Sequence, residues 1–182
     1  MIIALTGTPG IGKTSISKEL IKKGYEVIDL NKVVIDNKFL LGQDNERDSK
    51  IVDITKLNYY FKNNYREKDI VFVDGHLSHF LKCADFIIVL RLNPAMLYKN
   101  LVKRKWKKKK IKENLEAEML DIILCETIEI HSKEKIIELN MTDKSIEKIV
   151  KIIMELVKNK FKNIKKYKIG SIDWSEQILK EF

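Results

Sequence analysis

Short apolar runs alternate with amphipathic stretches along most of the chain. The apolar runs are nearly uninterrupted, which is typical of strands buried on both faces of a parallel sheet. They predict strands at 2–6, 25–30, 69–75, 84–92 and 135–140. Apolar positions three and four residues apart predict helices at 13–23, 53–65, from 94 onward, 112–130 and 144–160. Strands alternating with helices indicate an α/β domain with a parallel sheet and right-handed crossovers.

Residues at the ends of the predicted helices support this assignment. Gly24 closes the first helix, because glycine favours helix ends. Asn93 and Pro94 begin another, since proline is tolerated in the first helical turn. Either Thr142 or Asp143 can cap the last helix.

Two stretches interrupt the alternation. The segment 31–52 is polar and irregular, with Gly42 and a charged stretch from residue 44 to residue 50, as expected of a flexible insertion that covers a substrate. The tail from residue 163 onward is rich in lysine and then contains Gly170 and Trp174. Its pattern assigns it no role.

Size and composition favour a single domain over residues 1–182. A mass of 21.4 kDa with 45% hydrophobic residues allows one core of ordinary size. No stretch approaches the roughly 20 apolar residues that cross a bilayer, and no charged leader precedes the first strand. We therefore expect a soluble, cytoplasmic protein with no membrane partner. Cys83 and Cys125 lie far apart without metal-ligand spacing, so we expect buried thiols rather than a disulfide or zinc site.

The net charge of +9 comes from one segment. Nine basic residues and no acidic residue lie between positions 99 and 112, which leaves the rest of the chain formally neutral. They are Lys99, Lys103, Arg104, Lys105, Lys107, Lys108, Lys109, Lys110 and Lys112. Such a segment attracts polyanions, here nucleotide phosphates or RNA. A solvated lysine-rich helix face is an equally good interpretation of the lysines.

The most specific motif is the segment from Gly7 to Thr14, Gly-Thr-Pro-Gly-Ile-Gly-Lys-Thr. It matches the phosphate-loop pattern of glycine, four residues and Gly-Lys-Thr, and it lies between a predicted strand and a predicted helix. Gly10 and Gly12 let backbone N–H groups converge on phosphates at the positive end of the helix. Lys13 would reach the β- and γ-phosphates, and the Thr14 hydroxyl can bind Mg²⁺.

Two side chains at the end of a neighbouring strand complement this loop. Asp74 follows the buried run 70–73, where an acid can organise Mg²⁺ directly or through water. His76 lies two residues further, where a side chain can face the γ-phosphate. From position alone, His76 could equally be a hydrogen-bonded structural histidine.

Arginine is scarce, with residues at positions 47, 66, 91 and 104. A guanidinium suits the spreading negative charge of phosphoryl transfer, because its planar fork matches phosphate geometry. Arg104 lies in the basic segment between two predicted helices, where a mobile lid would lie, and is the first candidate. Arg91 ends a predicted central strand, where it could be structural or could face the same cleft.

Taken together, the segments GTPGIGKTS, VDGH and KRKWKKKKIKENLEAEML resemble the adenylate kinase isoenzyme 6 family, also called the coilin-interacting nuclear ATPase family, in its archaeal branch. The similarity covers roughly residues 1–160. It implies a nucleoside monophosphate kinase fold with five parallel strands. The fold would carry a monophosphate-binding insertion at about 30–53, a short lid at about 103–113 and a C-terminal tail at about 161–182.

The resemblance also implies roles for individual residues. The ATP contacts would be Gly10, Gly12, Lys13, Thr14, Ser15 and the lid residue Arg104. Asp74 and His76 would be the acid and histidine pair that organises Mg²⁺ and supports hydrolysis. Lys32 stands where relatives generally have an arginine, and would contact the monophosphate as a point charge rather than a bidentate fork. Trp106 replaces a lid tyrosine found in many relatives.

These residues leave two functions open. One is transfer of the ATP γ-phosphoryl group to AMP or another nucleoside monophosphate. The other, also implied by the family, is an ATPase switch in late small-subunit ribosome maturation, acting through a small-subunit ribosomal protein and 16S rRNA in the pre-ribosomal particle. Both need ATP and Mg²⁺. A GTPase switch is disfavoured, because no Asn-Lys-x-Asp segment occurs.

Overall fold

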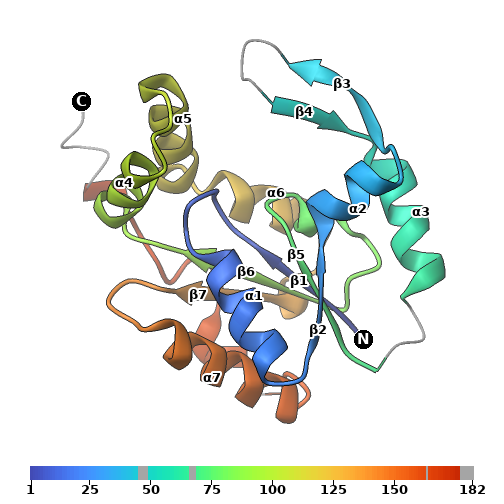
Figure 1. Cartoon of the computed structure of the whole chain (residues 1–182). Helices are drawn as coiled ribbons and strands as arrows, with labels where there is room; N and C mark the ends of the chain where they lie inside the picture. Colours follow the sequence, from blue (N-terminus) through green and yellow to red (C-terminus); the bar gives the residue numbers. More distant parts are fainter. Residues whose placement is uncertain (45–48, 66–68, 163, 177–182) are drawn as a thin grey trace.

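A five-stranded parallel sheet forms the middle of the protein (Figure 1). The computed structural model describes residues 1–44, 49–65, 69–162 and 164–176. The strand order is β2-β5-β1-β6-β7, with β1 at Ile2–Thr6, β2 at Glu26–Asp29, β5 at Val71–Asp74, β6 at Phe86–Arg91 and β7 at Ile136–Asn140. Leu5 pairs with Asp74 on one side and with Ile88 on the other. The expected α/β architecture is confirmed.

Alternate residues of β1 enter two cores, because successive side chains of a strand point to opposite faces. Ile3 and Leu5 belong to one core, together with side chains of α1 (Lys13–Lys22), α4 (Pro94–Lys103) and α7 (Ile146–Lys158). Ile2 and Ala4 belong to the other, with side chains of α2 (Leu30–Asp36) and α3 (Ile54–Asn64). Burial on both faces explains why these strands lack polar alternation.

The segment 31–52 is more regular than its sequence indicates. It contains most of α2 and the antiparallel strands β3 (Leu40–Asp44) and β4 (Ser49–Val52), and α3 follows. Val33 and Val34 bury one side of α2, whereas Leu40 and Leu41 of β3 are exposed. An exposed strand pair shows no apolar face, so the expectation of an irregular insertion was wrong in the described part. Part of the charged stretch, including Arg47, and also Arg66 lie outside the described residues.

The single helix expected at 112–130 is two helices, α5 (Lys108–Met119) and α6 (Ile122–Ile130). Between them Asp121 adopts a left-handed conformation with φ of 57°. The side chains of Glu118 and Asp121 both bind the Arg91 guanidinium, whose position fixes the break. Because Arg91 is distant in sequence, helical periodicity alone could not predict it.

Helix caps agree with expectation at one end and differ at another. Asn93 caps α4 as expected, with its Oδ1 accepting a hydrogen bond from the Ala95 N–H at 2.9 Å. The cap of α7 is Ser145 rather than Thr142 or Asp143. The Thr142 hydroxyl instead accepts from the backbone N–H of Asn93 at 3.0 Å, and so ties the ends of β6 and β7 together.

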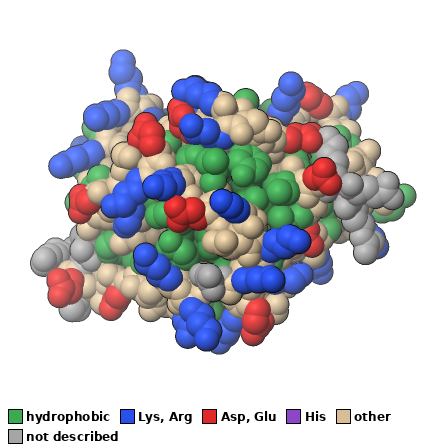
Figure 2. Space-filling view, turned by 90° about the horizontal axis from the view of Figure 1, so that it is seen from below, with side chains coloured by type: hydrophobic (Ala, Val, Ile, Leu, Met, Phe, Trp, Pro, Cys, Tyr) green, Lys and Arg blue, Asp and Glu red, His purple; other side chains and the backbone are tan. Residues whose placement is uncertain are grey.

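The remaining expectations concern exposure. Cys83 is half-buried and Cys125 is exposed, so the expectation of buried thiols was wrong. In the tail, Ile172 and Trp174 are buried against the core of α1 and α7. None of the described helices is long and apolar enough to span a membrane. Figure 2 views the molecule from the end opposite the carboxyl ends of the strands, where basic side chains surround a cluster of hydrophobic ones.

Candidate functional site

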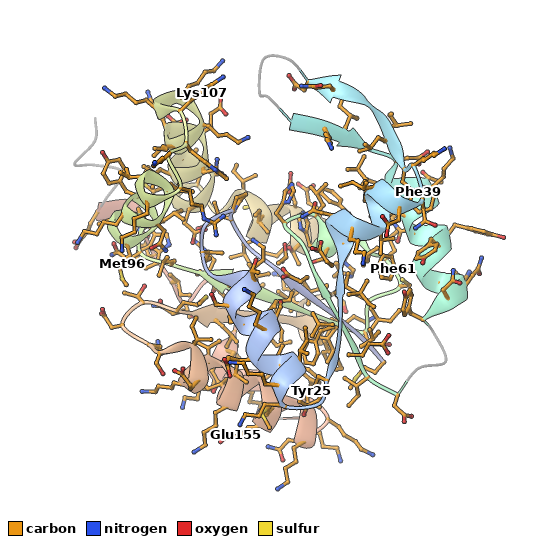
Figure 3. The ribbon with its side chains drawn as sticks, viewed as in Figure 1. Tyr25, Phe39, Phe61, Met96, Lys107 and Glu155 are labelled. Atoms are coloured by element: carbon orange, nitrogen blue, oxygen red, sulfur yellow. The ribbon has the colours of Figure 1, made fainter. Side chains whose placement is uncertain are left out.

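A cavity of about 150 Å³ opens at the carboxyl ends of β1, β2 and β5, the edge where ligands of open α/β sheets bind. Figure 3 shows the segments that carry Lys107 and Phe39 on opposite sides of this edge. The cavity is lined by Pro9, Gly10, Gly12, Lys13, Thr14, Asp29, Asn31, Asp74, Gly75, His76 and Arg104. Four segments distant in sequence therefore meet at one small space.

The loop between β1 and α1 can exist only with glycine at key positions. Gly7 has φ of +136°, and a Cβ there would lie 2.6 Å from the Leu90 carbonyl oxygen. Gly10 has φ of +96°, and its Cβ would lie 2.6 Å from Leu101 of α4. Gly12 begins α1 without a side-chain cap, which leaves first-turn N–H groups for an anion. The loop is thus shaped as a phosphate cradle.

Lys13 extends back over this loop. Its Nζ donates hydrogen bonds to the carbonyl oxygens of Gly7, at 2.5 Å, and Thr8, at 3.2 Å. Burial lowers the pKa of Lys13 to about 8, although the negative charges of Asp74 and Glu118 oppose this shift. The ammonium is therefore charged at neutral pH and held where it can move onto a phosphate.

Asp74 lies at the end of β5 beside the same loop. The Ser17 hydroxyl of α1 donates to its Oδ2 at 2.8 Å. Burial raises the pKa of Asp74, and the bond from Ser17 and the charge of Lys13 partly offset that rise. Thr14 and Asp74 both line the cavity and offer the oxygen ligands that Mg²⁺ prefers.

The arrangement fits a Mg²⁺ that keeps several waters. Among the described residues, no group of three or more His, Cys, Asp and Glu could hold a metal by itself. Mg²⁺ is usually bound through one or two carboxylates together with substrate phosphates and water, and so needs no complete protein cage. Thr14 and Asp74 would hold the ion when a nucleotide supplies the remaining oxygens.

His76 also lines the cavity and is half-buried. Its pKa is lowered to about 4, first by burial and then by the positive charges of Lys13 and Lys110. The imidazole is therefore neutral at pH 7. Its backbone carbonyl accepts a hydrogen bond from the Thr6 hydroxyl at 3.2 Å, which holds the turn after β5 against β1.

Arg104 reaches the cavity from the C-terminal end of α4, where its side chain is exposed. Lys105 follows with φ of 56°, and the chain then turns into α5. Asn100 ties α4 to the loop, because its side-chain amide donates to the Gly10 carbonyl oxygen at 3.0 Å. Lys110 Nζ lies 5.1 Å from the centre of the Trp106 ring, within reach of a cation–π contact.

Other candidates lie outside the cavity. Lys32 is exposed in α2, and Asp29 and Asn31 from that part of the chain line the cavity instead. Ser15 is exposed in the first turn of α1. Arg91 is structural in this arrangement, since it is buried in ion pairs with Glu118 and Glu138.

Sequence reasoning missed Ser17 as a member of the site. It considered Asp29 only as an alternative metal-binding acid, although Asp29 ends a strand at the same edge of the sheet as Asp74. Ser17 lies one helical turn beyond Lys13, and that spacing was a usable signal. Glu118 lies in the segment KRKWKKKKIKENLEAEML that carries the family resemblance, but the sequence assigned it no role. Its carboxylate accepts a hydrogen bond from the Thr8 hydroxyl of the loop at 2.5 Å.

Comparison with known proteins finds both a family and close relatives. The family model described as an AAA domain matches residues 3–121. The "Putative adenylate kinase" of Thermococcus gammatolerans is 42% identical over 177 residues, covering 97% of this chain and 94% of the relative. That of Methanocaldococcus jannaschii is 41% identical over 178 residues, with the same coverage of 97% and 94%.

Solved structures share the fold at low sequence identity. Shikimate kinase from Acinetobacter baumannii, in complex with shikimate, aligns with a TM-score of 0.60 at 15% identity, covering 87% of this chain and 93% of that one. Shikimate kinase from Bacteroides thetaiotaomicron aligns with a TM-score of 0.55 at 18% identity, covering 87% and 98%. The fold is that of the phosphate-loop kinases.

Proposed function

Because this chain belongs to the AAA-domain family and to the archaeal proteins named putative adenylate kinase, we propose that it transfers the ATP γ-phosphoryl group to a nucleoside monophosphate, with AMP as the acceptor. One observation carries the proposal. A single cavity combines the glycine cradle with Lys13, Asp74 and Arg104. Phosphoryl transfer needs mainly positioning and charge stabilisation, and these residues supply both.

Each residue has a distinct role in this proposal. The N–H groups at the start of α1 bind the phosphates, and Lys13 leaves its loop carbonyls to contact the β- and γ-phosphates. Arg104 approaches from the lid at about 103–113 and stabilises the charge that spreads over the transferred group. Bound Mg²⁺ would neutralise phosphate charge, with Thr14 and Asp74 as its protein ligands. His76 is neutral and can accept a hydrogen bond from an attacking water or hydroxyl.

The acceptor would lie on the side of the cavity formed by Asp29 and Asn31. This side belongs to the monophosphate-binding insertion at about 30–53. Lys32 is exposed one residue beyond Asn31 and would meet the acceptor phosphate after the insertion closes. Closure of the insertion and the lid would exclude water, which favours transfer to the monophosphate over hydrolysis.

The basic segment favours a second function for the same site. Lys107 to Lys109 are exposed at the start of α5, where they can meet a polyanion. Together with the resemblance to the isoenzyme 6 family, this supports an ATPase switch that acts on a small-subunit ribosomal protein and 16S rRNA during ribosome maturation.

Product analysis separates the two functions. The purified protein is incubated with Mg²⁺ and γ-labelled ATP, alone and with each nucleoside monophosphate, and the label is followed into nucleotide or inorganic phosphate. We expect AMP to stimulate ADP formation strongly and to receive the label. Label released only as phosphate, at a rate that no monophosphate changes, would overturn the kinase proposal and favour the switch.

A further inference from the structure

A buried carboxylate lies directly behind the phosphate loop. Glu118, near the end of α5, is only 2% exposed. Its Oε2 accepts the bond from the Thr8 hydroxyl at 2.5 Å. Its Oε1 accepts from Arg91 Nε at 2.8 Å and from the Leu92 backbone N–H at 3.1 Å. Both carboxylate oxygens therefore have partners, as a buried charge requires.

Arg91 carries this network across the sheet. Its Nη1 donates to Glu138 of β7 at 2.7 Å, and its Nη2 donates to the Glu118 backbone oxygen at 3.0 Å and to Asp121. The guanidinium is 2% exposed and meets the carboxylates of Glu118, Glu138 and Asp121. These ion pairs hold the Glu118 side chain in place, because moving its carboxylate would leave buried charges unpaired.

The network continues into the site through Thr8. The Thr8 hydroxyl binds Glu118, while the Thr8 carbonyl oxygen accepts from Lys13 Nζ at 3.2 Å. Glu118 is thus two hydrogen bonds away from the loop lysine. The same carboxylate belongs to α5, whose first turn carries the basic residues that follow Arg104. One side chain therefore connects the phosphate loop with the lid helix.

Resting on the proposed phosphoryl transfer, we propose that Glu118 is a positioning residue that acts through the Thr8 hydroxyl. It fixes the orientation of the Thr8 peptide, and so the resting position of Lys13, and it sets the register of α5 against the loop. Glu118 itself is not among the residues that line the cavity. Its effect reaches the reaction through Thr8 and Lys13.

Thr8→Val tests this link, because it removes only the hydroxyl and leaves the Arg91 pairs in place. We expect kcat/KM for ATP to fall about tenfold or more, the usual scale for losing a preorganising group. Thr8→Ser keeps the hydroxyl and is expected to retain more than about half of kcat/KM, since the hydrogen bond survives. Full activity in Thr8→Val, or equal losses in both variants, would overturn the proposal.

A matched control separates positioning from stability. The buried Thr127 hydroxyl of α6 also donates a 2.5 Å bond, to the Ile123 carbonyl oxygen away from the site. Thr127→Val should lower Tm and leave kcat unchanged when both are assayed well below Tm. A loss of kcat in Thr127→Val comparable to that in Thr8→Val would show that the effect is merely structural.

A double-mutant cycle then tests whether Glu118 acts through Thr8. If it does, the loss in kcat/KM from Glu118→Gln should shrink when Thr8 is already valine, whereas additive effects would contradict the link. The affinity of each variant for a fluorescent ATP analogue is measured as well. This measurement does not depend on catalysis, so it tests positioning separately from the proposed function. A wild type that binds the analogue but transfers no phosphate would refute the kinase, while weaker binding in Thr8→Val and normal binding in Thr8→Ser would still support positioning.

Discussion

Ser17 of α1 donates a hydrogen bond of 2.8 Å from its hydroxyl to Oδ2 of Asp74 at the end of β5. This bond connects the helix that follows the phosphate loop with the strand that supplies the acid. It favours the charged form of Asp74 against the effect of burial. A carboxylate that is to organise a metal must be both charged and oriented, and Ser17 contributes to each.

We predict that Asp74→Asn raises the Mg²⁺ concentration needed for half-maximal turnover while leaving nucleotide binding largely intact, since the loop amides still hold the phosphates. Ser17→Ala should shift the midpoint in the same direction, by about tenfold, as is usual when an outer-sphere partner of a metal ligand is lost. Titrations of turnover with Mg²⁺ measure both. An unchanged midpoint in Asp74→Asn would assign the metal to another acid, with Asp29 the first alternative.

Lys13→Ala should abolish both kinase and ATPase activity, because it removes a charge worth about 2–4 kcal/mol to the transition state. A variant retaining more than about a tenth of the activity would contradict the role of Lys13.

Lys13→Met tests the effect of the same lysine on stability. Burial disfavours the charged lysine, so folding bears this cost below the folded-state pKa of about 8 and is relieved of it as pH rises toward 10.5. The variant should therefore melt at a higher temperature than wild type at pH 7, with a smaller difference above pH 8.

The pH dependence of kcat/KM for ATP should descend as pH rises through about 8, where Lys13 of the free protein loses its proton. The corresponding fall in kcat should occur at a higher pH, because bound phosphates favour the charged form of Lys13. His76, with a pKa of about 4, stays neutral over the neutral range and should add no inflection near its ordinary value of 6.5. A profile of kcat/KM that stays flat well above pH 8 would contradict the assignment of Lys13.

Arg104→Ala should lower turnover at least about tenfold, because only a group that meets the transferred phosphate in the closed state stabilises the transition state. Changing Lys107, Lys108, Lys109 and Lys110 together to alanine should spare turnover and weaken binding to small-subunit rRNA, with a shallower salt dependence from counterion release. Steady-state kinetics and RNA binding at several salt concentrations measure the two effects. Equal losses of turnover in Arg104→Ala and in the fourfold lysine variant would refute these separate roles. Unchanged RNA binding in the fourfold variant would mean that the four lysines are ordinary solvated charges.

The sequence predicts those features whose causes are local. Strands buried on both faces show as apolar runs, and the phosphate loop needs glycine at fixed spacing, so both were found. Asp74 follows from its place at a strand end. The break between α5 and α6 at Asp121 depends on the ion pair with Arg91. The N-cap of α7 is Ser145, and the Thr142 hydroxyl binds the backbone N–H of Asn93 instead. Such contacts join residues distant in sequence, where no periodicity records them.

Which residue of the first turn of α2 lines the cavity was harder to predict for the same reason. Asn31, rather than Lys32, lines the cavity, because Asp29 accepts hydrogen bonds from the backbone N–H groups of both residues and so fixes the first turn of α2. A resemblance assigns a residue by its position in a motif, whereas the helix start decides which neighbour turns inward. The role of Lys32 therefore rests on closure of the insertion.

The central place of β1 has a consequence for hydrogen exchange. Its amides can exchange only when β1 separates from β5 or β6, which amounts to opening the whole sheet. Among the described strands, β3 and β4 pair only with each other, and β3 is largely exposed, so their amides can exchange through small local openings. We therefore expect slow exchange in the strand that precedes the phosphate loop and faster exchange in the strand pair of the insertion, on the proposed acceptor side. A bound acceptor should slow exchange at β1, because a ligand held only by the folded protein raises the free energy of opening the whole sheet. Exchange at β3 and β4 should slow only if their local opening also releases the acceptor.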